Sequence, residues 1–203
     1  MADSLGQGFS DAFALVGAKG VVITARKIET LKETKANINH ASPNVEVLPL
    51  ALEMTGDSSV KAAFDAIRAK FGTVDVLVNN AGLSGSASHF LRDDDMVTWW
   101  TDSVRFPDSC LMSCSADVGA SDRKSTFVAR NSYFLHLLGK ERQGTVVFFT
   151  SGPSLLMLPG SSSHSITKLS DLQLASYTAA EIENAIAVTF HPGIVDADMT
   201  TDF

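Results

Sequence analysis

The sequence is poor in cysteine, in long apolar runs and in positive charge, and each shortage excludes a class of protein. Its 203 residues include two cysteines, Cys110 and Cys114, in the segment Cys-Leu-Met-Ser-Cys. No Cys-x-x-Cys pair or nearby histidine completes a ligand set, so we expect no metal site. A reducing compartment keeps thiols free, so we expect no disulfide either. Both cysteines are interpreted as small apolar side chains in a loop.

Hydropathy and charge exclude two kinds of partner. No apolar stretch approaches the roughly 20 residues of a membrane span, and no charged-then-apolar leader opens the chain. The formal net charge of −7 argues against nucleic acid or an anionic membrane as the main partner. We therefore predict a cytoplasmic protein with no nucleic-acid and no membrane partner.

The sequence is otherwise that of a single globular domain over residues 1–203, with 45% hydrophobic and 19% charged residues. Short apolar runs alternate with helical periodicity along the chain, and this alternation predicts an α/β fold with a doubly wound parallel sheet. Strands are expected at 20–26, 45–50, 74–79, 144–150 and 185–190, and helices at 28–38, 58–71, 127–138 and 163–177.

One strand carries the strongest functional signal. The apolar run at 74–79 ends in Asn79, and Asn80, Ala81 and Gly82 follow it. In open α/β sheets, ligands bind at the carboxyl ends of the strands, and small residues there let a flat ligand approach the backbone. This strand therefore indicates a nucleotide-type site.

Two segments add chemistry suited to a dinucleotide. Gly6 and Gly8 precede an apolar helical segment, which predicts a Gly-rich turn before a helix N-terminus that can hold a phosphate. Because only five residues precede Gly6, a plain N-terminal loop is the alternative.

Arg26 ends a predicted strand, where a guanidinium can pair with a ribose 2′-phosphate and favour NADP over NAD. A surface arginine without that role is the alternative.

One region interrupts the alternation. A helix is expected behind the acidic residues at 93–95, but periodicity is then lost in a segment rich in Ser and Asp that contains Pro107. A structureless stretch of about twenty residues is unusual inside a compact domain. We therefore predict an irregular insertion over residues 104–125.

Taken together, the segments resemble the short-chain dehydrogenase/reductase family in co-linear order from Gly6 onward. Asn79-Asn80-Ala81-Gly82 matches the Asn-Asn-Ala-Gly motif of the family, and the sequences at 163–168 and 191–195 are similar to those of filamentous-fungal members. The resemblance implies a Rossmann-like fold and an NAD(P)-dependent oxidoreductase that acts on a carbonyl or alcohol. It also hints at secondary metabolism.

The catalytic residues of the family carry over in part. The family uses a Tyr as acid/base, a Lys four residues later, a Ser that orients the substrate oxygen and an Asn in a proton relay. Lys168 matches the Lys and Ser151 matches the Ser, but His164 stands at the Tyr position. The cation of Lys168 disfavours imidazolium, and a neutral imidazole is a weaker donor than a tuned phenol. His164 is therefore the expected acid/base residue, with reduced strength.

The resemblance also implies a cofactor site for NADP(H), with NAD as the less favoured choice. Glu53 represents the acidic residue at the adenine, and Lys124 is the basic neighbour of the Asn position, which falls on Asp122. The expected cofactor-binding residues are Gly6, Gly8, Arg26, Glu53, Asn79, Asn80, Ala81, Gly82, Lys124, Lys168, Pro192, Gly193 and Val195.

The chain departs from the family pattern in three further places. The first and last strands of the family are not matched, and the insertion falls in the helix that builds the family's dimer interface. A homo-oligomer, typical of the family, is therefore in doubt. Two alternatives to an active enzyme stay open: a non-catalytic relative that binds a dinucleotide or a protein partner, and a truncated product that folds poorly.

Overall fold

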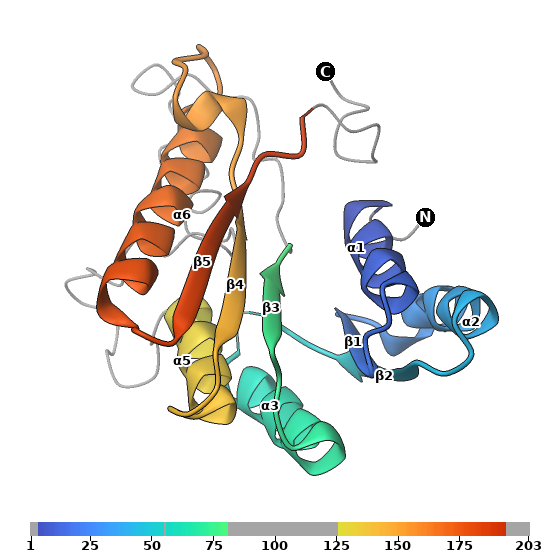
Figure 1. Ribbon diagram of the computed structural model, residues 1–203. Helices are drawn as coiled ribbons and strands as arrows, with labels where there is room; N and C mark the ends of the chain where they lie inside the picture. The colour runs from blue at the N-terminus through green and yellow to red at the C-terminus, as the bar shows by residue number, and fades with distance from the viewer. Residues whose placement is uncertain (1–3, 55, 81–125, 194–203) are drawn as a thin grey trace. The chain divides into compact units, whose positions relative to one another are not determined.

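The computed structural model describes residues 4–54, 56–80 and 126–193, whose helices and strands are drawn in Figure 1. The chain divides into two compact units, one containing the described residues up to Thr73 and the other those from Val74 onward. Within these ranges, none of the helices has the length and apolar character needed to cross a bilayer.

The first unit pairs two parallel strands with three helices. Strand β1 (Gly20–Ala25) lies beside β2 (Glu46–Ala51), and the register pairs Gly20 with Glu46. The helices are α1 (Ser4–Leu15), α2 (Leu31–Ala41) and α3 (Asp57–Phe71), and a 3-10 turn (Ile28–Thr30) precedes α2. Helix α1 packs against α2 and β1, while α2 and α3 both contact β2.

The core of the first unit is apolar because alternate strand residues face the same helices. Val21 and Ile23 of β1 are buried with Ile38 of α2, which is completely inaccessible to solvent. The full buried cluster is Ala14, Val21, Ile23, Leu31, Ile38, Val45 and Val47.

Pro49 lies in the middle of β2 without breaking the pairing. The amide of Glu46 donates to the carbonyl of Lys19 (3.1 Å), and the amide of Leu52 donates to that of Ala25 (2.9 Å). Even-numbered amides of β2 therefore face β1, and the nitrogen of Pro49 faces the other edge. A proline that donates no hydrogen bond is tolerated at such an edge and discourages pairing with a further strand.

The second unit is a three-stranded parallel sheet in the order β3 (Val76–Asn79), β4 (Gly144–Phe149) and β5 (Ala185–Phe190). Helix α5 (Thr126–Leu138) packs on β4. Helix α6 (Ser162–Glu181) packs on β4, on β5 and on the 3-10 turn that follows β4 (Gly152–Ser154), and Figure 1 shows it running alongside the two strands.

The predicted α/β class with parallel strands is confirmed, and the five expected strands and four expected helices in the described ranges form with small shifts of their ends. The predicted turn at Gly6 and Gly8 is wrong, as is the alternative of a plain loop. Both glycines lie inside α1, where the Ser10 hydroxyl donates to the Gly6 carbonyl four residues earlier (2.9 Å). A glycine inside a helix is tolerated at a modest loss of helix propensity, which the packing of α1 on α2 and β1 offsets.

Three expectations are not tested by these elements. The predicted insertion at 104–125 and the helix behind residues 93–95 lie outside the described residues. The arrangement of residues 1–203 as one domain stays a prediction.

Candidate functional site

The carboxyl end of β4 brings two predicted catalytic residues to one place. Ser151 follows β4 after a single intervening residue, as the last residue before the 3-10 turn. The Lys168 ammonium donates a hydrogen bond to the carbonyl of Phe149, the last residue of β4, at 2.9 Å. Ser151 and Lys168 therefore lie at the same strand end, although they come from different elements.

His164 lies one helical turn before Lys168 on α6, so the two side chains share a helix face. The imidazole is half-buried. Burial lowers the pKa of His164 below its ordinary value of 6.5, and the positive charge of Lys168 lowers it further. The sequence identified Lys168 as the cause, but desolvation is the larger effect. The neutral form of His164 is therefore the dominant one at neutral pH.

A buried carboxylate that the sequence analysis missed completes this group. Asp171 Oδ2 lies 3.1 Å from Lys168 Nζ, and the two side chains are 2% and 11% exposed, respectively. The signal was available in the sequence, because Asp171 follows His164 by seven residues and Lys168 by three. Residues separated by three or seven positions lie on the same face of a helix. The buried residues of α6 are Ser163, Thr167, Lys168, Asp171 and Ala175.

The turn that carries Ser151 is fixed by its own hydrogen bonds. The Ser154 amide and hydroxyl both donate to the carbonyl of Ser151, at 2.9 and 2.6 Å, and the Ser154 hydroxyl also lies 3.0 Å from that of Thr150. Next to Ser151, a side chain on Gly152 would meet His191 Nε2 at 3.7 Å, so β5 ends close to this turn. The backbone around Ser151 is thus held in one geometry.

Asn79 anchors the end of β3. It is 2% exposed, and its Nδ2 donates to Asn131 Oδ1 of α5 at 3.4 Å. This amide therefore ties the end of β3 to α5, through a helix residue that no motif in the sequence identifies. Asn80 follows as a half-buried residue with contacts of its own.

Arg26 and Glu53 lie at the carboxyl edge of the two-stranded sheet in the first unit. Arg26 is exposed directly after β1, and Glu53 is exposed two residues after β2. The Glu53 amide donates a hydrogen bond to the Ser59 hydroxyl oxygen (3.0 Å), which ties this loop to the start of α3. Both residues therefore occupy the sheet edge at which α/β folds hold ligands.

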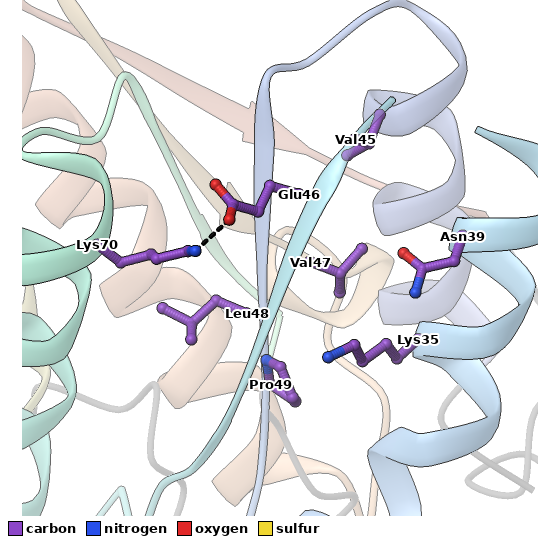
Figure 2. A pocket seen from close by; sticks show the side chains of 8 residues that line it. All are labelled: Lys35, Asn39, Val45, Glu46, Val47, Leu48, Pro49 and Lys70. Carbon is purple, nitrogen blue, oxygen red and sulfur yellow. Dashed lines mark ion pairs between the residues drawn. The ribbon is translucent and has the colours of Figure 1, made fainter. Parts of the chain in front are cut away.

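A groove in the first unit runs along β2, from Val45 to Pro49. Figure 2 shows it around the free edge of β2, with Lys35 and Asn39 of α2 on one side and Lys70, which forms an ion pair with Glu46, on the other. The groove encloses about 460 Å³ and is lined by Lys35, Asn39, Val45, Glu46, Val47, Leu48, Pro49 and Lys70. None of the predicted site residues belongs to it, so it is not the predicted dinucleotide site.

The remaining predicted residues divide into two groups. Pro192 and Gly193 follow β5, where Gly193 has a φ of +77° and donates its amide to His191 Nδ1 at 3.4 Å. A left-handed φ of this kind favours glycine. Ala81, Gly82, Lys124 and Val195 lie outside the described residues.

Known proteins of similar sequence come from the same family. The chain is 30% identical over 200 residues to the short chain dehydrogenase pigC of Monascus ruber, covering 96% of this chain and 60% of that protein. It is 28% identical over 203 residues to the short chain dehydrogenase citE of the same organism, covering 98% and 63%. The chain therefore spans less than two thirds of the length of these relatives.

Solved structures share the fold. A short-chain type dehydrogenase/reductase from Mycobacterium marinum superimposes with a TM-score of 0.78 at 16% identity, covering 98% of this chain and 72% of that one. An alcohol dehydrogenase from Thermococcus sibiricus, in complex with 5-hydroxy-NADP, gives 0.74 at 22% identity, covering 95% and 73%. These matches confirm the Rossmann-like fold class. The family profile for short chain dehydrogenases matches residues 1–203, and the chain belongs to the short-chain dehydrogenase family.

Proposed function

We propose that this protein is an NADP(H)-dependent oxidoreductase that interconverts a carbonyl and an alcohol, in the cytoplasm and in secondary metabolism. The observation that carries the proposal is the hydrogen bond from Lys168 to the Phe149 carbonyl. It sets the lysine expected to act in catalysis at the strand end that leads into Ser151, with His164 one turn away on the same helix face.

The residues at this strand end have complementary roles in such a reaction. The Ser151 hydroxyl donates a hydrogen bond to the substrate oxygen and orients the carbonyl. His164 supplies or removes the proton at that oxygen, and Lys168 holds the nicotinamide ribose through the Nζ donor that the described residues leave unused. The bound cofactor supplies the hydride.

The proposed choice of NADP over NAD rests on Arg26. Its guanidinium is exposed at the carboxyl edge of β1, where a planar fork of donors can bind a 2′-phosphate through two hydrogen bonds. Glu53 at the neighbouring strand end is proposed to contact the adenine. A structural neighbour, L-sorbose reductase of Gluconobacter frateurii, is described in complex with NADPH, which supports this choice (TM-score 0.71, 19% identity, covering 95% of this chain and 67% of that one).

An exposed apolar segment next to Ser151 indicates the character of the substrate. Leu155, Leu156, Met157 and Leu158 are 79, 64, 99 and 50% exposed, and they lie between Ser151 and His164 in the chain. Four consecutive exposed apolar residues mark a surface that gains stability when an apolar group covers it. We therefore propose a carbonyl substrate with a large apolar body.

His164 favours a second candidate function. Its lowered pKa leaves little imidazolium at neutral pH, and the neutral ring is a weak acid for carbonyl reduction. A protein that binds NADP(H) without turning over a substrate would have the same cofactor-binding residues. The two candidates differ only in the chemistry at position 164.

One variant separates the candidates. We expect the purified 203-residue chain to enhance NADPH fluorescence on binding and to oxidise NADPH slowly with apolar ketones. His164→Tyr should raise that turnover at least tenfold by restoring the phenol, an effect worth roughly 1.4 kcal/mol of activation free energy. His136→Tyr, the same change at an exposed position of α5, is the matched control and should change nothing.

The results of the binding and turnover measurements decide between the two candidate functions. If NADPH does not bind at millimolar concentration, the proposed oxidoreductase function is wrong. If NADPH binds but neither the native chain nor His164→Tyr oxidises it, the binding function replaces the enzymatic one.

A further inference from the structure

Asp171 is a carboxylate buried on the sheet side of α6, a position where a helix normally places an apolar residue. Its side chain is 2% exposed, and its Oδ2 lies 3.1 Å from Lys168 Nζ. A buried carboxylate without a cation or a hydrogen bond is strongly disfavoured. The pair with Lys168 therefore helps to accommodate Asp171 inside the fold.

The pair fixes the direction of the Lys168 ammonium. One N–H points to the Phe149 carbonyl on β4 and a second to Asp171 on α6, so two acceptors on different elements hold one group. A lysine stem has four rotatable bonds, and two charge-assisted hydrogen bonds remove most of that freedom. Within the described residues, the third N–H is not used, and its direction follows from the other two.

The carboxylate also affects the charge beside His164. His164, Lys168 and Asp171 follow one another at spacings of four and three residues on one face of α6. Among the described residues, α6 packs against β4, β5 and the turn after β4. His191, beside Gly152, is a further titratable group near the carboxyl end of β4. Asp171 is therefore the negative charge in this group, and it opposes the Lys168 cation.

We propose that Asp171 is a positioning residue of this site, which holds Lys168 at the carboxyl end of β4 for a bound dinucleotide and offsets its charge beside His164. The first part rests on the proposed NADP(H) function. The second part concerns the protein alone and can be tested without a cofactor.

The test compares Asp171→Asn with two other variants. Asp171→Asn should weaken NADPH binding, measured by fluorescence titration, roughly tenfold, because the carboxylate charge that holds the Lys168 ammonium is lost. It should also lower the pH midpoint of the His164 imidazole, measured by NMR of 15N-labelled histidine with His164→Gln for assignment. Asp171→Glu keeps the charge and should restore part of both properties. Glu181→Gln removes a charge from an exposed position of the same helix and should leave both unchanged.

The native chain provides a check that does not depend on the folding of a variant. An ammonium held by two protein acceptors should give a slowly exchanging 15N signal near neutral pH, and Lys168→Arg should remove it. The absence of that signal would contradict the proposal. So would an Asp171→Asn variant that binds NADPH and titrates like the native chain. If the native chain binds no NADPH, the proposed function is wrong, and the ammonium signal and the His164 midpoint alone decide the role of Asp171.

Discussion

Two ion pairs within helices show how differently the two units use charge. Lys61 and Asp65 on α3 lie 2.6 Å apart with side chains 58 and 53% exposed, and Lys168 and Asp171 on α6 lie 3.1 Å apart with side chains 11 and 2% exposed. The hydrogen bond with Lys61 lowers the pKa of Asp65, but water screens a pair of this kind. The α6 pair has no such screening, so each partner depends strongly on the other.

The same contrast extends to what each unit buries. The cluster behind β1 and β2 consists of Ala, Val, Leu and Ile, whereas four of the five buried residues of α6 are polar or charged. The five are Ser163, Thr167, Lys168, Asp171 and Ala175. A buried ion pair adds little stability compared with apolar side chains of similar volume. Its presence in the second unit is therefore better explained by the positioning role proposed for Asp171 than by stability.

The largest expected effect comes from breaking the buried pair. Lys168→Met leaves Asp171 buried without its cation and should lower the free energy of unfolding by about 3–5 kcal/mol, measured by urea denaturation. Lys61→Met removes the same charge from the exposed pair and should change the unfolding curve by no more than its experimental error.

A double variant sharpens this result. Lys168→Met with Asp171→Leu removes both charges and should recover most of the stability that Lys168→Met loses. If Lys168→Met is as harmless as Lys61→Met, the buried pair contributes nothing and the contrast between the two helices disappears.

A smaller effect is expected from two glycines that begin strands in different units. A side chain on Gly144 of β4 would lie 2.6 Å from Leu138 Cδ2 and 2.9 Å from Phe134 Cζ, and both of those residues are buried in the core. A side chain on Gly20 of β1 would clash with the ring of Phe71, which is half-buried and can turn away. Gly144→Ala should therefore destabilise the protein by about 1–3 kcal/mol, and Gly20→Ala by less.

Thermal unfolding of the two alanine variants measures this difference. An equal loss at both positions would show that Leu138 and Phe134 yield as readily as Phe71, so that the two units tolerate close packing equally well.

The sequence predicted the helices and strands better than the contacts between side chains. The strand at 144–150 and the helix at 163–177 follow from apolar runs and periodicity, and Ser151, His164 and Lys168 were identified by their spacing in a family motif. The spacing of Asp171 from His164 and Lys168 was visible in the sequence, but its burial was missed because it depends on which helix face packs on β4. That choice is made by the tertiary structure and not by local preference.

The two other differences have similar causes. Gly6 and Gly8 were expected in a turn because glycine favours turns, but the packing of α1 on α2 and β1 keeps them in a helix. Asn131 was missed because its partner, Asn79, is 52 residues away in the chain. A contact at that separation leaves no periodic pattern that a single sequence can reveal.

The smallest expected effect is a pH dependence that distinguishes His164 from an exposed histidine of the first unit. Because the fold lowers the pKa of His164 below 6.5, the unfolded chain binds a proton more readily than the folded one. The contribution of His164 to the free energy of unfolding is fully present above about pH 6.5, and it is lost as the pH falls from there toward the lower pKa of the folded state.

Urea denaturation between about pH 7 and pH 5 should therefore show a loss of stability that His164→Gln reduces. His40→Gln, at an exposed position of α2, should leave the loss in place. Equal curves for the native chain and His164→Gln would mean that the ring takes up a proton inside the fold despite burial and the Lys168 cation, and His164 would then be a competent acid.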